Sequence, residues 1–182
     1  MASAGTFTDS GQTLGTASSV DIAFGDIDGD GDLDAFVANR THPNVVWLNN
    51  GSGTFTDSGQ TLTPGGNTLG VVFGDVDGDG DLDAMIANLN QANTVWLHNG
   101  SGTFTDSGQT LGTAGSTGLA LGDVDGDGDL DAIVSNQNVE PNVVWLNNGS
   151  GTFTDSGQTL GTAISRGVVF GDVDGEIGRA HV

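Results

Sequence analysis

The 182-residue sequence contains no cysteine and no lysine, and only three of its residues are basic. Without cysteine the chain can form neither a disulfide framework nor a thiolate metal site, and the redox compartment stays undetermined. The shortage of basic residues leaves a formal net charge of −21 at pH 7. A chain this acidic repels phosphates over its whole surface, which excludes nucleic acid as a partner.

Long apolar runs are also missing. No stretch approaches the ~20 apolar residues of a transmembrane helix, so we expect no membrane span. The first residues, MASAGTFTDSG, have neither the basic nor the apolar region of a signal peptide. If the parent protein is secreted, we expect this chain to lack its beginning.

The acidic residues are unevenly distributed. Most of the 24 Asp and Glu residues lie in four short segments that share one spacing. A generally acidic, salt-adapted surface would explain little of this clustering. Bound cations explain it better, because closely spaced carboxylates repel one another unless their charge is neutralised.

The string GTFTDSGQTL occurs four times, starting at residues 5, 53, 102 and 151, so the sequence repeats with a period of 48 or 49 residues. Such a period is typical of propeller blades with four strands each, whereas helical repeats are usually shorter. In the first complete unit we expect strands at about 20–25, 33–39, 44–49 and 54–62, because β-branched and apolar runs alternate there with turn signals. The predicted fold is all-β, a β-propeller fragment of four-stranded antiparallel blades.

Successive antiparallel strands reverse direction, so the first and third connections of a blade emerge at the same end. This places the acidic segments and the NGSG turns at one end of every blade. The loops between the second and third strands, which vary among units (RTHP, LNQA and QNVEP), belong to the opposite end together with the connections between units.

The chain divides into six predicted parts. We expect residues 1–17 to be the fourth strand of a preceding partial blade, and residues 18–66, 67–115 and 116–163 to be three complete blades. Residues 164–175 are expected to form the first strand of a truncated blade. The last residues, 176–182, depart abruptly from the repeat, and we interpret them as a non-native tail.

Each complete unit contains an acidic loop of the form DxDGDGDxD, with five carboxylates in nine residues. Calcium takes six to eight oxygen ligands in flexible geometry, whereas zinc favours His or Cys and magnesium keeps its waters. We therefore predict about three Ca²⁺ ions, one per loop, with side-chain ligands at positions one, three, five and nine and a main-chain ligand at position seven. The predicted metal residues are Asp26, Asp28, Asp30, Asp32 and Asp34; Asp75, Asp77, Asp79, Asp81 and Asp83; and Asp123, Asp125, Asp127, Asp129 and Asp131.

Glycine at position six of each loop, for example Gly31, permits the sharp turn around the ion. An EF-hand loop opens in the same way but ends with a bidentate Glu at position twelve. That position holds Val37, Ile86 and Val134 here, and the flanks are β-rich, so helix–loop–helix is the weaker interpretation. A fourth loop begins at Asp172 and loses its remaining ligands, and we expect no good site there.

The segment FGDVDGDGDLDAMIAN, with VVWLNNGSGTF in the neighbouring units, resembles the FG-GAP or VCBS repeats, relatives of the blades in integrin α-subunits. The resemblance covers nearly all of residues 3–175. It implies a seven-bladed propeller in a secreted or surface protein, with calcium at the base of the blades and ligands at the opposite face. Three complete units are too few to close a ring of at least four blades.

The remaining residues give no indication of a catalytic site. Trp47, Trp96 and Trp145 recur at one position per unit, and we predict inter-blade packing for them rather than a sugar-stacking platform. The histidines form no catalytic constellation, and no serine or cysteine nucleophile has a motif-like partner. We expect no enzyme activity and no catalytic residue, because the paired carboxylates would be occupied by metal.

The sequence therefore predicts a non-enzymatic, calcium-binding scaffold for adhesion or for a protein or carbohydrate ligand at the variable-loop end. An extracellular location is expected, since such calcium modules bind at ~10⁻⁴ to 10⁻³ M and would stay empty in the cytosol. Two alternatives remain open: an accessory region of a larger secreted hydrolase or lyase, and a purely structural spacer. Exposed edges of the open array could also lead to self-association.

Overall fold

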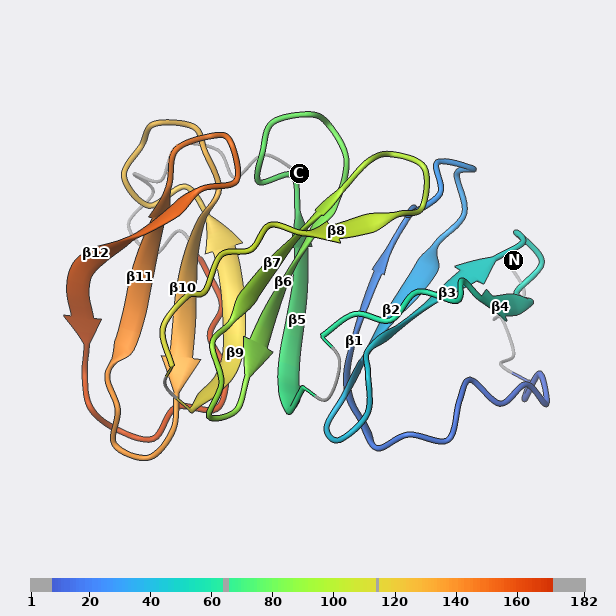
Figure 1. Ribbon diagram of the computed structural model, residues 1–182, viewed down its shortest axis with the longest axis horizontal. Coiled ribbons are helices and arrows are strands. Elements are labelled where there is room, and N and C mark those ends of the chain that lie inside the picture. The colour runs from blue at the N-terminus through green and yellow to red at the C-terminus, as the bar shows by residue number, and fades with distance from the viewer. Residues whose placement is uncertain (1–7, 64–65, 114, 172–182) are drawn as a thin grey trace, which may run out of the picture.

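The computed structural model describes residues 8–63, 66–113 and 115–171. These residues form three four-stranded antiparallel sheets that stand side by side as an open array of propeller blades (Figure 1). There is no helix among them, so no described helix could cross a membrane. The all-β, open-propeller prediction is confirmed, and helix–loop–helix is excluded for the acidic loops.

Each sheet is a simple meander in chain order. The first sheet consists of β1 (Ser19–Gly25), β2 (Asp34–Asn39), β3 (Val45–Asn49) and β4 (Phe55–Asp57). The second consists of β5 (Thr68–Gly74), β6 (Asp83–Asn88), β7 (Thr94–His98) and β8 (Phe104–Asp106), and the third of β9 (Ser116–Gly122), β10 (Asp131–Asn136), β11 (Asn142–Asn147) and β12 (Phe153–Leu160). The acidic loops and the NGSG turns lie at the upper end in Figure 1, and the variable loops at the lower end.

The fourth strand is shorter than predicted in the first two sheets. β4 and β8 each have three residues, whereas the prediction for the first unit extended to residue 62. The Asp57 carboxylate accepts a hydrogen bond from the Gly59 backbone N–H at 2.8 Å, and Gly59 has φ of +76°. The same turn occurs at Asp155 and Gly157 within β12, which continues to Leu160, so the turn alone does not end a strand. Beyond β4 the ladder resumes only as an isolated bridge between Asn44 and Leu62.

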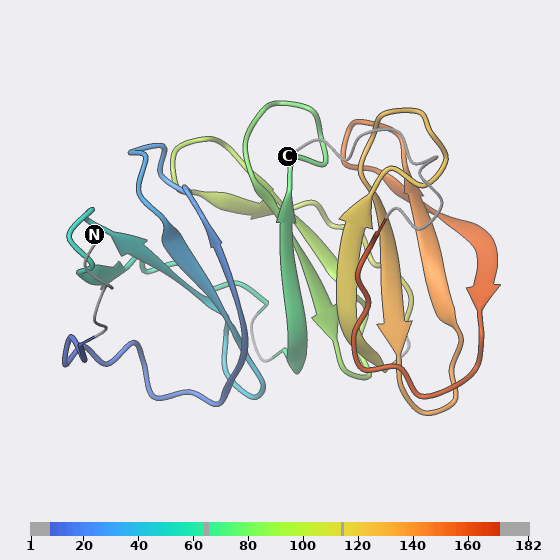
Figure 2. The same cartoon turned by 180° about the vertical axis from the view of Figure 1, so that it is seen from behind.

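The two incomplete end segments form no strand where they are described. Residues 8–18 and 161–171 lack the neighbouring strand that would complete a ladder, so the strands predicted within 1–17 and 164–175 are not seen there. Residues 165–171 nevertheless follow β9, with the Thr117 hydroxyl donating to the Ser165 carbonyl at 2.9 Å (Figure 2). Residues 172–182, including the start of the fourth loop and the interpreted tail, lie outside the described residues.

The hydrophobic core lies between the sheets. The forward face of a sheet, which meets the next sheet, is defined in the first sheet by Ile27, Phe36, Val46 and Leu62. The rear face, which meets the preceding sheet, is defined in the second sheet by Phe73, Leu82, Trp96 and Phe104. These residues share one hydrophobic cluster, apart from Leu82, which lies against Gly25 of the first sheet. An equivalent cluster joins the second and third sheets. Trp96 and Trp145 both contribute to these clusters, as the inter-blade packing prediction requires.

A glutamine clamp ties each repeat to the next. The Gln60 side chain donates to the Gly102 carbonyl and accepts from the Phe104 backbone N–H at 2.9 Å. Gln109 makes the same pair of bonds to Gly151 and Phe153, and Gln12 makes it to Gly53 and Phe55. The clamp therefore recurs at every described junction.

A second polar connection runs through the opposite end of the sheets. Asn44 accepts from the Asn39 backbone N–H and donates to the Thr68 hydroxyl, which in turn donates to Asn88. The same sequence of bonds continues through Asn93, Ser116, Asn136, Asn142 and Ser165. Most of these side chains are fully buried, and each is hydrogen-bonded, as a stable buried polar group must be.

Candidate metal centre

Each acidic loop connects the first and second strands of its sheet, and its ninth residue opens the second strand. The loop closes on its own first carboxylate: Asp26 accepts hydrogen bonds from the backbone N–H groups of Gly29 and Gly31 at 2.9 and 3.0 Å. Gly31 has φ of +90°, a conformation that favours glycine. The same bonds form on Asp75 and Asp123, so the predicted turn at position six is confirmed in all three loops.

The ninth residue is held from two directions. Asp34 is fully buried and accepts from the Ile27 backbone N–H at 2.8 Å and from the Asn49 backbone N–H at 2.7 Å. Asp83 accepts from Val76 and His98, and Asp131 from Val124 and Asn147. The ninth carboxylate therefore joins the loop to the end of the third strand in every sheet. This confirms that the acidic loops and the NGSG turns share one end.

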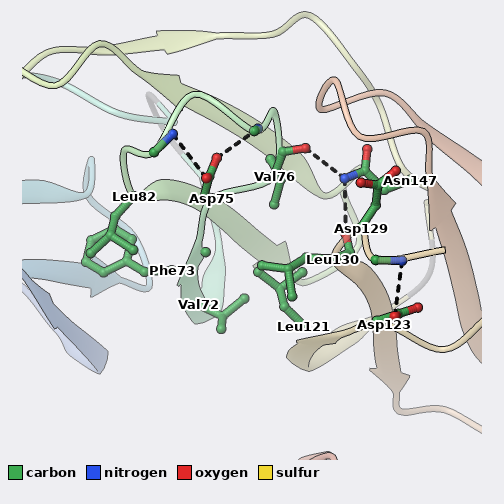
Figure 3. A pocket seen from close by; sticks show the side chains of 14 residues that line it. Val72, Phe73, Asp75, Val76, Leu82, Leu121, Asp123, Asp129, Leu130 and Asn147 are labelled. Carbon is green, nitrogen blue, oxygen red and sulfur yellow. Dashed lines mark hydrogen bonds between the residues drawn. The ribbon is translucent and has the colours of Figure 1, made fainter. Parts of the chain in front are cut away.

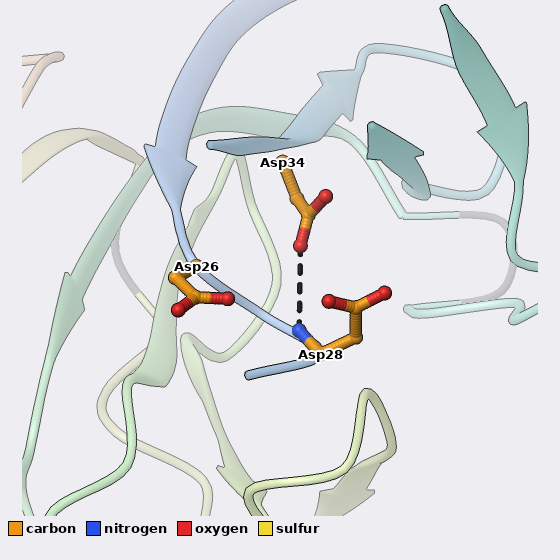
Figure 4. A group of neighbouring side chains, drawn as sticks. All are labelled: Asp26, Asp28 and Asp34. Carbon is orange, nitrogen blue, oxygen red and sulfur yellow. Dashed lines mark hydrogen bonds between the residues drawn. The ribbon is translucent and has the colours of Figure 1, made fainter. Parts of the chain in front are cut away.

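Three carboxylates converge in each loop, with one oxygen of each within 4.8 Å of the others. In the first loop they are Asp26, Asp28 and Asp34 (Figure 4). Positions one, three and nine also converge in the second loop, as Asp75, Asp77 and Asp83. The third loop differs, because positions one, three and five come together instead: Asp123, Asp125 and Asp127.

The other predicted ligands lie outside these triads. Asp30 and Asp79, at position five, accept the backbone N–H of position seven at 2.9 and 3.0 Å, and Asp131 is the ninth-position residue just described. The side chains of position seven, in Asp32, Asp81 and Asp129, lie against the turn glycines Gly51, Gly100 and Gly149, where an added Cβ would collide with the carboxylate. The position-seven carboxylates thus pack under the NGSG turns, which leaves only their main chain free to turn toward an ion.

Burial and mutual repulsion make the metal-free loops unfavourable. Desolvation raises the pKa of Asp83 to about 6, opposed by the N–H groups of His98 and Val76 and reinforced by the charges of Asp77 and Asp79. Desolvation also raises the pKa of Asp28 and of Asp77, and repulsion from other loop carboxylates adds to it. A bound cation would relieve both effects, because it favours the ionised form of every carboxylate around it.

The first two loops are covered by the next sheet. A Cβ added at Gly29 would lie 3.5 Å from the Gly100 carbonyl oxygen, and one added at Gly102 would lie 3.5 Å from the Asp28 Cβ. In the second loop, the Val76 carbonyl accepts from the Gly151 backbone N–H and from the Asn147 side chain, at 2.8 and 2.7 Å. Each of these loops therefore lies at a junction between two repeats.

The third loop has no such cover in the part of the chain that the structure describes. Its second residue, Val124, is 39% exposed, whereas the equivalent Ile27 and Val76 are 0% and 2% exposed. The different triad of the third loop accompanies this difference in cover. Among the described residues, the carboxylates at positions one, three and nine converge in the two loops that a following repeat packs against.

A cavity of about 620 Å³ opens between the second and third sheets at the acidic-loop end (Figure 3). Val72, Leu121 and Leu130 are among the apolar residues that line it, and Asp75, Asp123 and Asp129 line it too. Residues of two successive acidic loops therefore line one space.

Sequence reasoning missed the residues that brace the loops from the third strand. Asn49, His98 and Asn147 each donate a backbone N–H to the ninth carboxylate of their own sheet, and the Asn147 side chain also reaches the loop of the preceding sheet. The recurrence of Asn-Gly directly after Asn49, His98 and Asn147, the last residues of the third strands, was the available signal. It was interpreted only as a tight turn.

The geometry agrees with comparison to known families. A family model described as an FG-GAP-like repeat matches the chain three times, over residues 26–86, 75–134 and 123–176. Each match begins at the first carboxylate of an acidic loop. No curated protein matches the chain.

Proposed function

The chain belongs to the FG-GAP-like repeat family, and from this premise we propose that it is a calcium-binding propeller module that serves as an extracellular, non-enzymatic scaffold for adhesion or ligand binding. One observation carries the proposal: three loops each bring together three carboxylates that could hold a metal ion. The recurrence of this arrangement, once per repeat, argues against a chance meeting of exposed acidic groups.

The donor set fits calcium. Each loop offers carboxylate and main-chain oxygens and no thiolate, and the remaining ligands of a six- to eight-coordinate ion would come from the main chain or from water. Calcium accepts such a set in flexible geometry, whereas magnesium demands a near-ideal octahedron and retains its waters. About three ions are proposed, one for each complete loop.

The position of the loops gives the ion a structural role. The first and second loops lie between their own NGSG turn and the turn of the next sheet, so an ion there would hold two repeats as well as one loop. Binding that occurs only in the folded state raises stability by mass action. Calcium would thus set the rigidity of the array and the geometry of whatever the array presents.

Three parts of the proposal go beyond the loops themselves. The absence of catalysis follows from assigning the clustered carboxylates to metal. The extracellular location follows from the calcium concentration that modules of this kind require. The ligand face is assigned to the variable loops at 40–43, 89–92 and 137–141, because the acidic-loop end is occupied by the ions and the NGSG turns. The expected partner there is a protein or a carbohydrate.

Isothermal titration calorimetry with Ca²⁺ and Mg²⁺ tests the metal, using Asp75→Ala against Asp155→Ala as a matched control. Asp155 lies in β12, outside the acidic loops, and is exposed. Asp75→Ala should remove one binding event, and Asp155→Ala should leave all of them. A protein that binds no Ca²⁺, or that binds it equally well with Asp75 replaced, would refute the proposal. Glycan and protein arrays, probed with the wild type and with variants whose variable loops are exchanged for glycine and serine, test the ligand face.

A further inference from the structure

The hairpin turn after each third strand contains an asparagine followed by a glycine. The three pairs are Asn50-Gly51, Asn99-Gly100 and Asn148-Gly149. All three asparagines are exposed, so water reaches their side chains. The glycines have φ of +74°, +67° and +72°, and no side chain shields their backbone nitrogens. Each turn therefore places a labile side-chain amide next to an unhindered backbone nitrogen.

The side-chain carbonyl of each of these asparagines is surrounded by donors. Asn50 Oδ1 accepts from the Ser52 backbone N–H at 3.1 Å, from the Ser52 hydroxyl at 2.7 Å and from the Thr54 backbone N–H at 3.2 Å. Asn99 and Asn148 accept the same three bonds within their own turns. Donors in this position favour attack on the side-chain carbon, because they stabilise the negative charge that develops on the oxygen.

The second turn differs from the other two at the nitrogen of its glycine. The Gly100 backbone N–H donates to Nδ1 of His98 at 3.2 Å. His98 stands where the other two sheets have an asparagine. The N–H groups of Gly51 and Gly149 donate to no residue that the structure describes. A hydrogen bond from the glycine nitrogen thus distinguishes one of three otherwise equivalent turns.

The imidazole of His98 is fixed in place. It is 5% exposed and lies against Phe104, with the ring centroids 4.7 Å apart. The Ile27 carbonyl of the first sheet accepts from the ring, and the Gly102 backbone N–H lies 3.0 Å from Nε2. A neutral imidazole accepts at one nitrogen only, and the tautomer with its proton on Nε2 leaves Nδ1 to accept from Gly100. The nitrogen of Gly100 is therefore held away from reaction.

We propose that Asn50 and Asn148 are sites of spontaneous deamidation and that His98 protects Asn99 from the same reaction. The glycine nitrogen loses its proton to solvent and bonds to Cγ of the asparagine, the Cγ–Nδ2 bond breaks, and the amide takes up a proton and leaves as ammonia. Water then opens the cyclic succinimide at either carbonyl, which yields aspartate or isoaspartate. At Asn99 the hydrogen bond from Gly100 to His98 must break before the nitrogen attacks.

The modification changes the end of the blades that carries the acidic loops. The Asp32 carboxylate lies against Gly51, and the Asp129 carboxylate lies against Gly149. Each deamidation thus creates a carboxylate beside one that is already present, and neighbouring carboxylates repel each other. It also makes a chain of net charge −21 still more negative.

Mass spectrometry of proteolytic fragments measures the reaction at each asparagine after the folded wild type has been incubated at mildly alkaline pH. Residues 43–62 and 141–160 are identical, so the fragments must extend beyond these ranges to separate the first turn from the third. Asn50 and Asn148 should be modified about two- to tenfold faster than Asn99, which is the rate effect of one hydrogen bond. In urea, where the contact with His98 is lost, the three rates should be equal.

Two variants complete the test. His98→Asn gives the second sheet the residue of the other two sheets and should raise the rate at Asn99 to that at Asn50. The rate at Asn50 in the same sample reports any general loosening of this variant. His42→Asn, in an exposed variable loop, should leave all three rates unchanged. The proposal is overturned if Asn99 is modified as fast as Asn50 in the folded wild type, if Asn50 and Asn148 stay unmodified, or if His98→Asn leaves the rate at Asn99 unchanged.

Discussion

The buried carboxyl of Asp83 makes the metal-free protein respond to pH in an unusual direction. Its pKa in the folded state is about 6, against 3.8 for an unperturbed aspartate, chiefly because burial disfavours the charged form. The folded state therefore holds this proton more tightly than the unfolded state does. The stability that results is fully present below about pH 4 and is lost as the pH rises through about 6.

The size of the effect follows from the two pKa values. At about 1.4 kcal/mol for each unit of pKa, the difference between them corresponds to about 3 kcal/mol of unfolding free energy. Asp83→Asn removes the titrating group, so the difference in stability between the wild type and this variant isolates it. We expect that difference to fall by up to about 3 kcal/mol between about pH 4 and pH 7.

Urea unfolding in the presence of a chelator, at a series of pH values, measures both proteins. With saturating Ca²⁺ the wild type should instead gain stability relative to the variant as the pH rises, because only the ionised carboxylate can bind the ion. Calcium affinity should fall as the pH drops through about 6. If the difference in unfolding free energy between the wild type and the Asp83→Asn variant is the same at every pH, the assignment of a raised pKa to Asp83 is refuted.

Three other predictions concern the repeats. Gln60→Ala removes two inter-sheet hydrogen bonds and should cost about 1–3 kcal/mol, lowering the melting temperature by several degrees. Gln158→Ala, at the equivalent position of the third repeat, which no described sheet follows, is the control and should change the melting temperature little. Asn93→Ala breaks the buried polar connection between the second and third sheets and should cost about 1–3 kcal/mol by urea unfolding, and a loss below about 0.5 kcal/mol would contradict that role. Calorimetry should resolve the third loop as the weakest calcium site, so Asp123→Ala should remove a weaker binding event than Asp75→Ala does, and the reverse order would contradict the importance of cover by a following repeat.

Much of the fold could be predicted because the same sequence repeat occurs several times in the chain. Apolar and β-branched runs separated by turn signals predicted the first three strands of the first unit to within a residue or two. Strand connectivity alone placed the acidic loops and NGSG turns at one end. The local hydrogen bonds of the loops, such as those from Gly29 and Gly31 to Asp26, join residues three and five apart and follow from local turn chemistry.

What the sequence did not reveal depends on contacts between repeats. Gln60 bonds to residues 42 and 44 positions away, and Asn44 bonds to Thr68 across a junction, so no local pattern indicates either role. The early end of β4 accompanies the bonds of Gln60 to the next sheet, whereas β12, which has the same turn at Gly157, continues to Leu160. The distinct triad of the third loop likewise accompanies the lack of cover by a following repeat among the described residues, since its sequence is the same as that of the second loop.

The most direct test of the account is the thermal unfolding of the wild-type chain with a chelator and with millimolar Ca²⁺, followed by circular dichroism. If the three acidic loops hold calcium in the folded state, the melting temperature should rise with calcium concentration, and equal concentrations of Mg²⁺ should raise it less. A melting curve that is the same with chelator and with calcium would contradict the claim that these loops are calcium sites.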